Sequence, residues 1–335
     1  MTTWPSKMSE APAPEVAVII AAWNAEATLA AAISSVLAQH EVHVEVFVID
    51  DASTDATRTV AECAAAADTR VTVVAQPQNA GPAAARNRGL DVSHAPYLTV
   101  LDSDDTMTPW RLRRLVNIAR EGDWDFVADD LYKVSSDTPD APRTRLWSQT
   151  EIGQVTITFE QFVRGNLQAH HGGRGEMGFL KPLMKRDFLE RQGLRYAENM
   201  RLGEDYALYA TALAKGAKFC LTDPLGYVAL VRPGSLSGQH CAADLGALAA
   251  ADKRLRDEPG LTSAERRSVR IHEIETQKRW LWMRLIEAVK ARDFRDGLRC
   301  FVAPPVVVAH LVRSLGEQVW LRSGSVMRIV FSKQP

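Results

Sequence analysis

Short apolar runs alternate with helix-like segments over the first part of this chain. Four apolar, mostly β-branched runs are predicted to be strands: residues 16–23, 44–50, 71–75 and 97–101. Apolar or small residues at helical spacing predict helices between them: residues 25–39, 55–67 and 82–91. Strands that are apolar throughout and alternate with helices indicate an α/β, Rossmann-like fold, with a mostly parallel sheet covered by helices on both faces.

Each apolar run ends in a polar or acidic loop. The loops read WNAE, DDASTD, QNAGPAAARNRG and DSDD in chain order. The carboxyl ends of parallel strands lie along one edge of the sheet, and open α/β sheets bind their ligands there. The chemistry is therefore expected at this edge.

The acidic loop after the fourth run has the clearest chemistry. Asp102 and Asp104 lie one residue apart and can share a divalent cation, Mn²⁺ or Mg²⁺, because such ions take oxygen ligands and substrate phosphates. The alternative is a turn in which Asp and Ser cap the next helix, with Pro109 in its first turn. The motif alone leaves both interpretations open.

Two other loops offer groups for an anionic nucleotide. Asp50 and Asp51 end the second run and can accept hydrogen bonds from a base or a ribose, although Asp55 nearby also suits helix capping. Arg86 would lie one turn into the third helix and could reach a phosphate or a base, helped by the positive end of the helix. Arg88 is interpreted as a surface residue.

Taken together, these loops resemble those of the inverting family-2 glycosyltransferases with the GT-A fold, over roughly residues 15–240. AAWNAE is similar to the first nucleotide-binding loop, DDASTD to the base and ribose site, NAGPAAARNRG to the arginine-bearing helix, and DSD to the D-x-D metal motif. The first loop departs from the family pattern, with Ala21 in place of a common proline and Trp23 in place of tyrosine. A tryptophan can still stack on a base.

The resemblance implies a role for each matched position. The donor would be bound by Ala22, Trp23, Asn24, Glu26, Asp50, Asp51, Asn79, Gly81, Arg86, Asp102, Ser103 and Arg232. The metal ligands would be Asp102 and Asp104, with His240 either completing the metal shell or simply solvent-exposed.

The resemblance also implies a general base in the second half of the catalytic domain. Asp205, after Glu204 at the start of a helical pattern, would take the proton from the acceptor hydroxyl in one inverting displacement. Glu204 would orient the acceptor. Without the upstream motifs, both would be read as acidic residues favoured in the first turn of a helix.

The expected organisation has three parts. They are a disordered leader over residues 1–14, a catalytic domain over 15–240 with a nucleotide-sugar half (15–108) and an acceptor half (109–240), and a helical region over 241–335. The tail after residue 290 mixes bulky apolar residues with Arg313, Arg322 and Arg328. Two interpretations of the tail stay open: helices lying on an anionic membrane surface, or a packed lobe or homodimer interface.

Net charge, cysteine spacing and the length of the apolar runs exclude several classes of protein. Forty basic and forty-one acidic residues leave a net charge of −1, so no overall field attracts nucleic acid. The four cysteines are scattered, which argues against a zinc site or a disulfide framework and favours the cytosol. No apolar run is long enough for a transmembrane helix. A peripheral place at the inner face of the cytoplasmic membrane is compatible with the tail.

The sequence thus predicts a metal-dependent, inverting glycosyltransferase that moves one sugar, with UDP-glucose as the implied donor, to a saccharide acceptor. Membrane docking of the tail would make that acceptor lipid-linked, and bacterial exopolysaccharide assembly of the succinoglycan type is the most similar setting. Thr276 stands where the Q-x-x-R-W motif of processive synthases has its glutamine, which argues against polymerisation.

Other functions fit the sequence less well. A nucleotidyltransferase should carry a Gly-rich, basic loop after the first strand, and a dinucleotide-dependent oxidoreductase should carry G-x-G-x-x-G. The first loop, AAWNAE, has neither. A non-catalytic nucleotide-sugar-binding protein has no need of both Asp104 and Asp205.

Overall fold

The structure is a computed structural model and describes residues 12–136, 138, 141–167, 177–231 and 240–331. Side chains at residues 319 and 322–331 are outside that description. Two compact units make up the chain, residues 1–233 and 234–335. Most of the leader expected over residues 1–14 lies outside the described residues.

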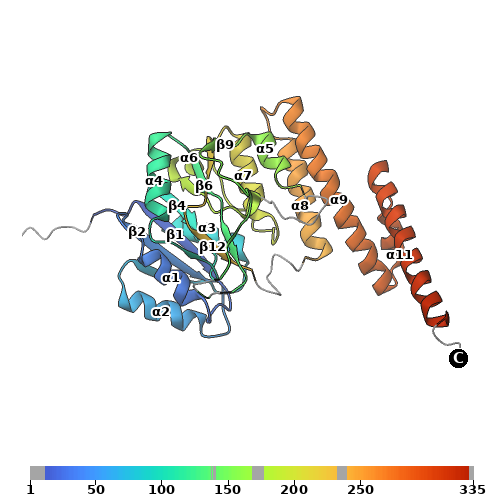
Figure 1. The fold of residues 1–335 in the computed structure, drawn as a ribbon, viewed down its shortest axis with the longest axis horizontal. Coiled ribbons are helices and arrows are strands. Elements are labelled where there is room, and N and C mark those ends of the chain that lie inside the picture. The colour runs from blue at the N-terminus through green and yellow to red at the C-terminus, as the bar shows by residue number, and fades with distance from the viewer. Residues whose placement is uncertain (1–11, 137, 139–140, 168–176, 232–239, 332–335) are drawn as a thin grey trace, which may run out of the picture. The chain divides into compact units, whose positions relative to one another are not determined.

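The first unit is built on an eight-stranded sheet in the order β3-β2-β1-β4-β10-β6-β11-β9 (Figure 1). Its first four strands are parallel: β1 (Val16–Ala22), β2 (Val44–Asp50), β3 (Val71–Ala75) and β4 (Tyr97–Val100). Ala22 pairs with Asp50, and Asp50 pairs with Ala75, so these strands end at one edge. The predicted mostly parallel α/β sheet is confirmed.

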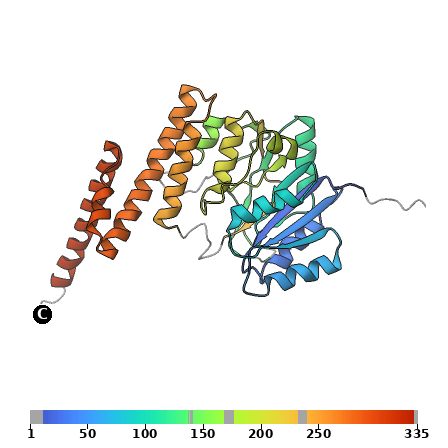
Figure 2. The same ribbon diagram turned by 180° about the vertical axis from the view of Figure 1, so that it is seen from behind.

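Helices cover both faces of these strands, as the sequence predicts. The helices are α1 (Leu29–Leu37), α2 (Thr57–Ala67) and α3 (Pro82–Val92). α1 lies on the face seen in Figure 1, and α3 lies on the face seen in Figure 2. α1 begins four residues later than predicted, because the N–H groups of Ala25 and Glu26 donate to the side chains of Thr57 and Asp55 instead of entering a helix.

The other half of the sheet is mixed. Its strands are β6 (Phe126–Asp129), β9 (Val155–Thr156), β10 (Leu183–Lys185) and β11 (Phe219–Thr222). β10 runs antiparallel to both of its neighbours, β4 and β6. Short strands within the predicted acceptor half, residues 109–240, thus complete the sheet.

The remaining elements of the first unit surround this half. The helices are α4 (Arg111–Glu121), α5 (Phe159–Arg164), the 3₁₀ turn η1 (Met177–Phe179), α6 (Arg186–Arg191) and α7 (Glu204–Ala214). A second, four-stranded sheet has the order β5-β12-β7-β8. Its strands are β5 (Thr106–Met107), β12 (Tyr227–Leu230), β7 (Tyr132–Val134) and β8 (Thr144–Arg145).

Small residues let α3 lie close to β1. A Cβ atom at Gly89 would collide with the buried Ile19 side chain, 2.9 Å from its Cγ1. We expect Gly89→Ala to lower the free energy of unfolding by about 1–3 kcal/mol, because the core has no room for the methyl group. Urea denaturation measures this effect. Gly316→Ala is the matched helical control, since nothing lies within 4 Å there, and an equal loss in both variants would contradict the packing argument.

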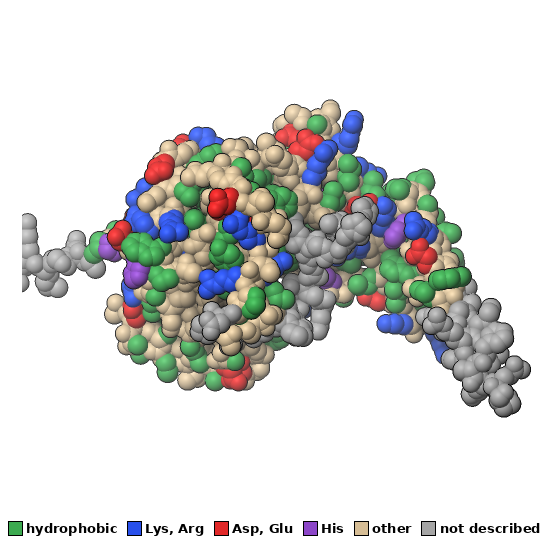
Figure 3. Space-filling model, in the orientation of Figure 1, with side chains coloured by type: hydrophobic (Ala, Val, Ile, Leu, Met, Phe, Trp, Pro, Cys, Tyr) green, Lys and Arg blue, Asp and Glu red, His purple; other side chains and the backbone are tan. Residues whose placement is uncertain are grey.

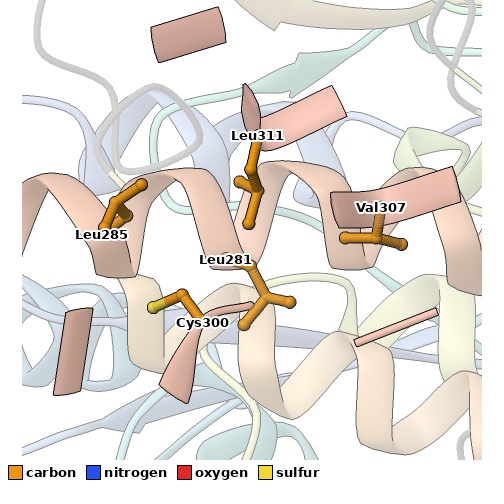
Figure 4. Close-up of a cluster of buried hydrophobic side chains, with 5 residues drawn as sticks. All are labelled: Leu281, Leu285, Cys300, Val307 and Leu311. Carbon is orange, nitrogen blue, oxygen red and sulfur yellow. The ribbon is translucent and has the colours of Figure 1, made fainter. Parts of the chain in front are cut away.

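The second unit consists of helices: α8 (Ala242–Arg256), α9 (Ser263–Ala291), α10 (Phe294–Arg299) and α11 (Pro305–Phe331). The helical region predicted over residues 241–335 is divided into separate helices, and α9 begins after Thr262, whose side chain forms a capping box with Glu265. Buried side chains of α9 and α11 meet around Cys300 (Figure 4): Leu281, Leu285, Val307 and Leu311. Among the described residues, no helix is both long and apolar enough to cross a membrane.

Candidate active site

The first two loops at the carboxyl edge of the sheet hold each other. Asn24 has a left-handed backbone (φ 49°), and its side-chain oxygen accepts a hydrogen bond from Thr54 N at 2.9 Å. The Glu26 carboxylate accepts from Ala56 N at 2.8 Å. Trp23 is 48% exposed beside them, whereas Ala22 is buried. The loop therefore presents an exposed indole on a fixed backbone.

Asp51 holds the third loop. Its carboxylate accepts hydrogen bonds from Ala80 N and Gly81 N, both at 2.8 Å, and from the Gln76 side chain. Asn79 is exposed and donates to the Asp51 carbonyl oxygen. Gly81 precedes α3 with φ 88°, a conformation that L side chains rarely adopt. These bonds fix the start of the helix that carries Arg86.

Charged side chains from four segments meet beyond the end of β4. Arg86 of α3 is buried and contacts Asp102 at 3.0 Å, Glu204 at 2.7 Å and Asp205 at 3.2 Å. Lys181, also buried, contacts Asp205 at 2.7 Å and Asp102 at 3.1 Å. Two cations thus join Asp102 to the adjacent pair Glu204 and Asp205, which follow it by about a hundred residues in the chain. We call these five residues the charge cluster.

The members of the charge cluster stabilise one another's ionised forms. Burial opposes the charge of Arg86, but Asp205 and Glu204 outweigh it and raise the pKa of the guanidinium. Burial also opposes the charge of Lys181, and Asp102 and Asp205 raise the pKa of its ammonium group. The carboxyl of Asp102 is opposed by burial too, yet Lys181 and Arg86 lower its pKa to about 2. Arg86, Lys181 and Asp102 are therefore charged at neutral pH.

The acidic loop divides into residues with different surroundings. Ser103 and Asp104 are half-buried, as is Asp102. Asp105 is buried and accepts hydrogen bonds from the Tyr227 hydroxyl and from Leu230 N, both at 2.8 Å, which ties the loop to β12. Burial and the neighbouring charges of Asp102 and Asp104 raise the pKa of Asp105 to about 8.

The donor set of this loop suits a cation that arrives with a diphosphate. Among the described residues, no group of three or more His, Cys, Asp or Glu could hold a metal ion alone. Mg²⁺ is commonly bound by one or two carboxylates together with substrate phosphates and water. Asp102, whose side chain is 34% exposed, and the half-buried Asp104 meet that smaller requirement.

Lys181 is the member of the charge cluster that the sequence analysis missed. It precedes β10, and its carbonyl oxygen accepts a hydrogen bond from Arg111, which is itself paired with the buried Asp129. A lone lysine in the apolar stretch GFLKPLM was the available signal, because a lysine in a buried segment needs an acidic partner.

Two of the predicted site residues, Arg232 and His240, are not among the described residues of the first unit. Arg232 is outside the described residues. His240 belongs to the second unit, where it lines a cavity of about 310 Å³ together with Leu245, Arg279, Trp282, Met283 and Ile286. Asp50 is buried at the end of β2, where its carboxylate accepts a hydrogen bond from Ser53 N.

A mostly parallel α/β sheet with a D-x-D loop at its carboxyl edge is the arrangement of the glycosyltransferases with a GT-A-like fold. Residues 17–188 match the family model "Glycosyl transferase family 2". The chain belongs to this family, and it is a glycosyltransferase.

Two relatives from Rhizobium meliloti (strain 1021) match nearly the whole chain. Succinoglycan biosynthesis protein ExoU is 42% identical over 305 residues, which are 91% of this chain and 88% of the relative. Succinoglycan biosynthesis protein ExoO is 34% identical over 301 residues, 89% of this chain and 84% of the relative. The matches extend beyond the family model into the rest of the chain.

Solved structures share the fold at low identity. The crystal structure of S. aureus TarS 1–349 has a TM-score of 0.59 and 15% identity, covering 84% of this chain and 89% of that one. The same protein in complex with UDP-GlcNAc has a TM-score of 0.61 at the same identity and coverage. This likeness supports the fold of the chain.

Proposed function

We propose that this enzyme transfers a single sugar from a UDP-sugar to a saccharide acceptor, with inversion and with a divalent cation, Mn²⁺ or Mg²⁺. The charge cluster is the observation that carries the proposal, because it joins the D-x-D residue Asp102 to the proposed base Asp205 through Arg86 and Lys181. The UDP complexes of TarS, a protein of similar fold, support UDP as the nucleotide. We propose glucose as the sugar, as the family resemblance implies.

Asp205 takes the proton from the acceptor hydroxyl as that oxygen attacks the anomeric carbon. Its carboxylate is held at the start of α7 by Lys181 and Arg86, with the Tyr209 hydroxyl at 3.5 Å. Glu204, one residue earlier, orients the acceptor. The incoming diphosphate competes with Asp205 for the two cations, so donor binding leaves the carboxylate freer to accept a proton.

Asp102 and Asp104 would hold the divalent cation, which supplies positive charge to the departing diphosphate. Arg86 and Lys181 add fixed charge on the same side, and Arg232 is a further proposed contact of the donor. Trp23 stacks on the uracil ring, and its neighbours in the donor site are Ala22, Asn24, Glu26, Asp50, Asp51, Asn79, Gly81 and Ser103. Asp51 and Asn24 act by fixing the loops they brace.

We propose that the acceptor is a lipid-linked saccharide in bacterial exopolysaccharide biosynthesis, at the cytoplasmic face of the membrane. The two relatives named for succinoglycan biosynthesis support this setting, since each covers most of this chain. The four free cysteines fit a reducing compartment. Nuclear magnetic resonance of the product tests inversion directly, because the new glycosidic bond should have the opposite anomeric configuration to the donor.

The metal assignment has its own test in Asp104→Ala. We expect this variant to bind the UDP-sugar at least about tenfold more weakly than wild type with Mn²⁺ present, and equally without metal. Calorimetry measures both affinities. Asp187→Ala, which removes an exposed carboxylate of α6, is the control. Equal affinity of wild type and Asp104→Ala in the presence of metal would refute the assignment.

A further inference from the structure

The second unit exposes large apolar side chains over one short segment. They run from the end of α9 through α10 to the following loop, and their exposed fractions are 67% for Val289, 80% for Phe294, 71% for Leu298 and 86% for Val302. Phe294 and Leu298 are four residues apart and share one face of α10. We call residues 289–302 the 289–302 surface.

Basic side chains accompany these apolar ones. Lys290, Arg292, Arg295 and Arg299 are all exposed, and with two acidic residues the segment has a net charge of +2. The whole chain, in contrast, has a net charge of −1. Figure 3 shows hydrophobic and basic side chains near one another on the visible face of this unit.

The two acidic residues of the segment, Asp293 and Asp296, form hydrogen bonds or ion pairs within the second unit. Asp293 caps α10 by accepting a hydrogen bond from Asp296 N at 3.0 Å. The Asp296 carboxylate pairs with Arg284 of α9. The four basic side chains of the 289–302 surface are therefore exposed, whereas its two carboxylates are engaged in contacts within the second unit.

We propose that the 289–302 surface docks on an anionic lipid bilayer. Phe294 and Leu298 enter the boundary between headgroups and acyl chains, and the flanking lysine and arginines meet lipid phosphates. A second copy of the chain fits less well, because a two-fold interface places each patch against its own equivalent and brings like charges together. The docking requires no membrane-spanning helix.

The test is sedimentation of the full chain with vesicles, either of phosphatidylcholine alone or with added phosphatidylglycerol. We expect the protein to bind the anionic vesicles selectively, with an affinity that falls as salt is added. Arg295→Gln/Arg299→Gln should lower the affinity about thirtyfold, since each cation near the surface contributes slightly more than about fivefold. Phe294→Ser/Leu298→Ser should lower it at least about tenfold.

Matched variants separate this surface from general effects. Arg58→Gln/Arg191→Gln removes two exposed cations from helices of the first unit, and Ile271→Ser removes an exposed apolar side chain elsewhere on α9; neither should change binding. Sugar transfer to a soluble acceptor should be unaltered in all variants, which separates the docking from the catalytic proposal. Equal binding to neutral and anionic vesicles, or no binding, would overturn the inference. So would a dimer in analytical ultracentrifugation that Phe294→Ser/Leu298→Ser dissociates.

Discussion

Replacing Asp205 with Asn is expected to lower the rate of sugar transfer by about 10³-fold while donor binding stays nearly intact. Asn keeps the shape of the side chain and an oxygen that can accept from Lys181, which lies 2.7 Å from the native carboxylate. It cannot take a proton from the acceptor. The loss should therefore fall on the chemical step and leave the affinity for the UDP-sugar nearly unchanged.

Single-turnover transfer and donor calorimetry on the same preparation separate these effects. Glu204→Gln is the matched control, because Glu204 precedes Asp205 and contacts the same guanidinium of Arg86. We expect the control to raise the KM for the acceptor with a smaller loss of rate. Full activity of Asp205→Asn, or a loss of donor affinity as large as the loss of rate, would exclude Asp205 as the base.

Replacing Arg86 with Met should lower the free energy of unfolding by about 3–5 kcal/mol, the usual cost of breaking a buried ion pair. Arg86 is buried and contacts Asp102, Glu204 and Asp205, and in its absence Lys181 faces two of these carboxylates alone. The variant should also bind the UDP-sugar more weakly, because one cation of the diphosphate site is lost.

Arg88→Met provides the comparison for Arg86→Met. Arg88 lies on the same helix but is exposed, so its loss should change stability by less than about 0.5 kcal/mol. Urea denaturation of both variants measures the difference. If the two arginines proved equally dispensable, the charge cluster would not be the structural centre of the site.

The strands of the nucleotide-sugar half could be predicted from local sequence patterns, because the apolar runs in the sequence are the segments that form the buried strands. β2 and β3 have the predicted bounds, since both are apolar runs that end abruptly in polar loops. β10 was missed: three residues, Leu183–Lys185, carry too little periodicity to define a strand, and their antiparallel pairing with β4 and β6 depends on contacts distant in the chain.

In the charge cluster, too, local motifs predicted individual residues, whereas contacts between distant parts of the chain could not be predicted. Arg86, Asp102, Glu204 and Asp205 were proposed as site residues from motifs, and the structure brings all four together. Their mutual pairing was not foreseen, because the sequence analysis assigned Arg86 to a phosphate or base. Lys181 belongs to no motif, and only its apolar neighbours marked it. The separate roles of Asp102 and Asp105 depend on Tyr227, far along the chain.

The most direct test of the central claim is turnover of a panel of UDP- and GDP-sugars by the purified protein, with Mn²⁺ or Mg²⁺ and then with EDTA. The account predicts turnover of one UDP-hexose that requires the divalent cation and that Asp205→Asn abolishes. Turnover that EDTA leaves unchanged, or no turnover together with no nucleotide binding by calorimetry, would contradict it.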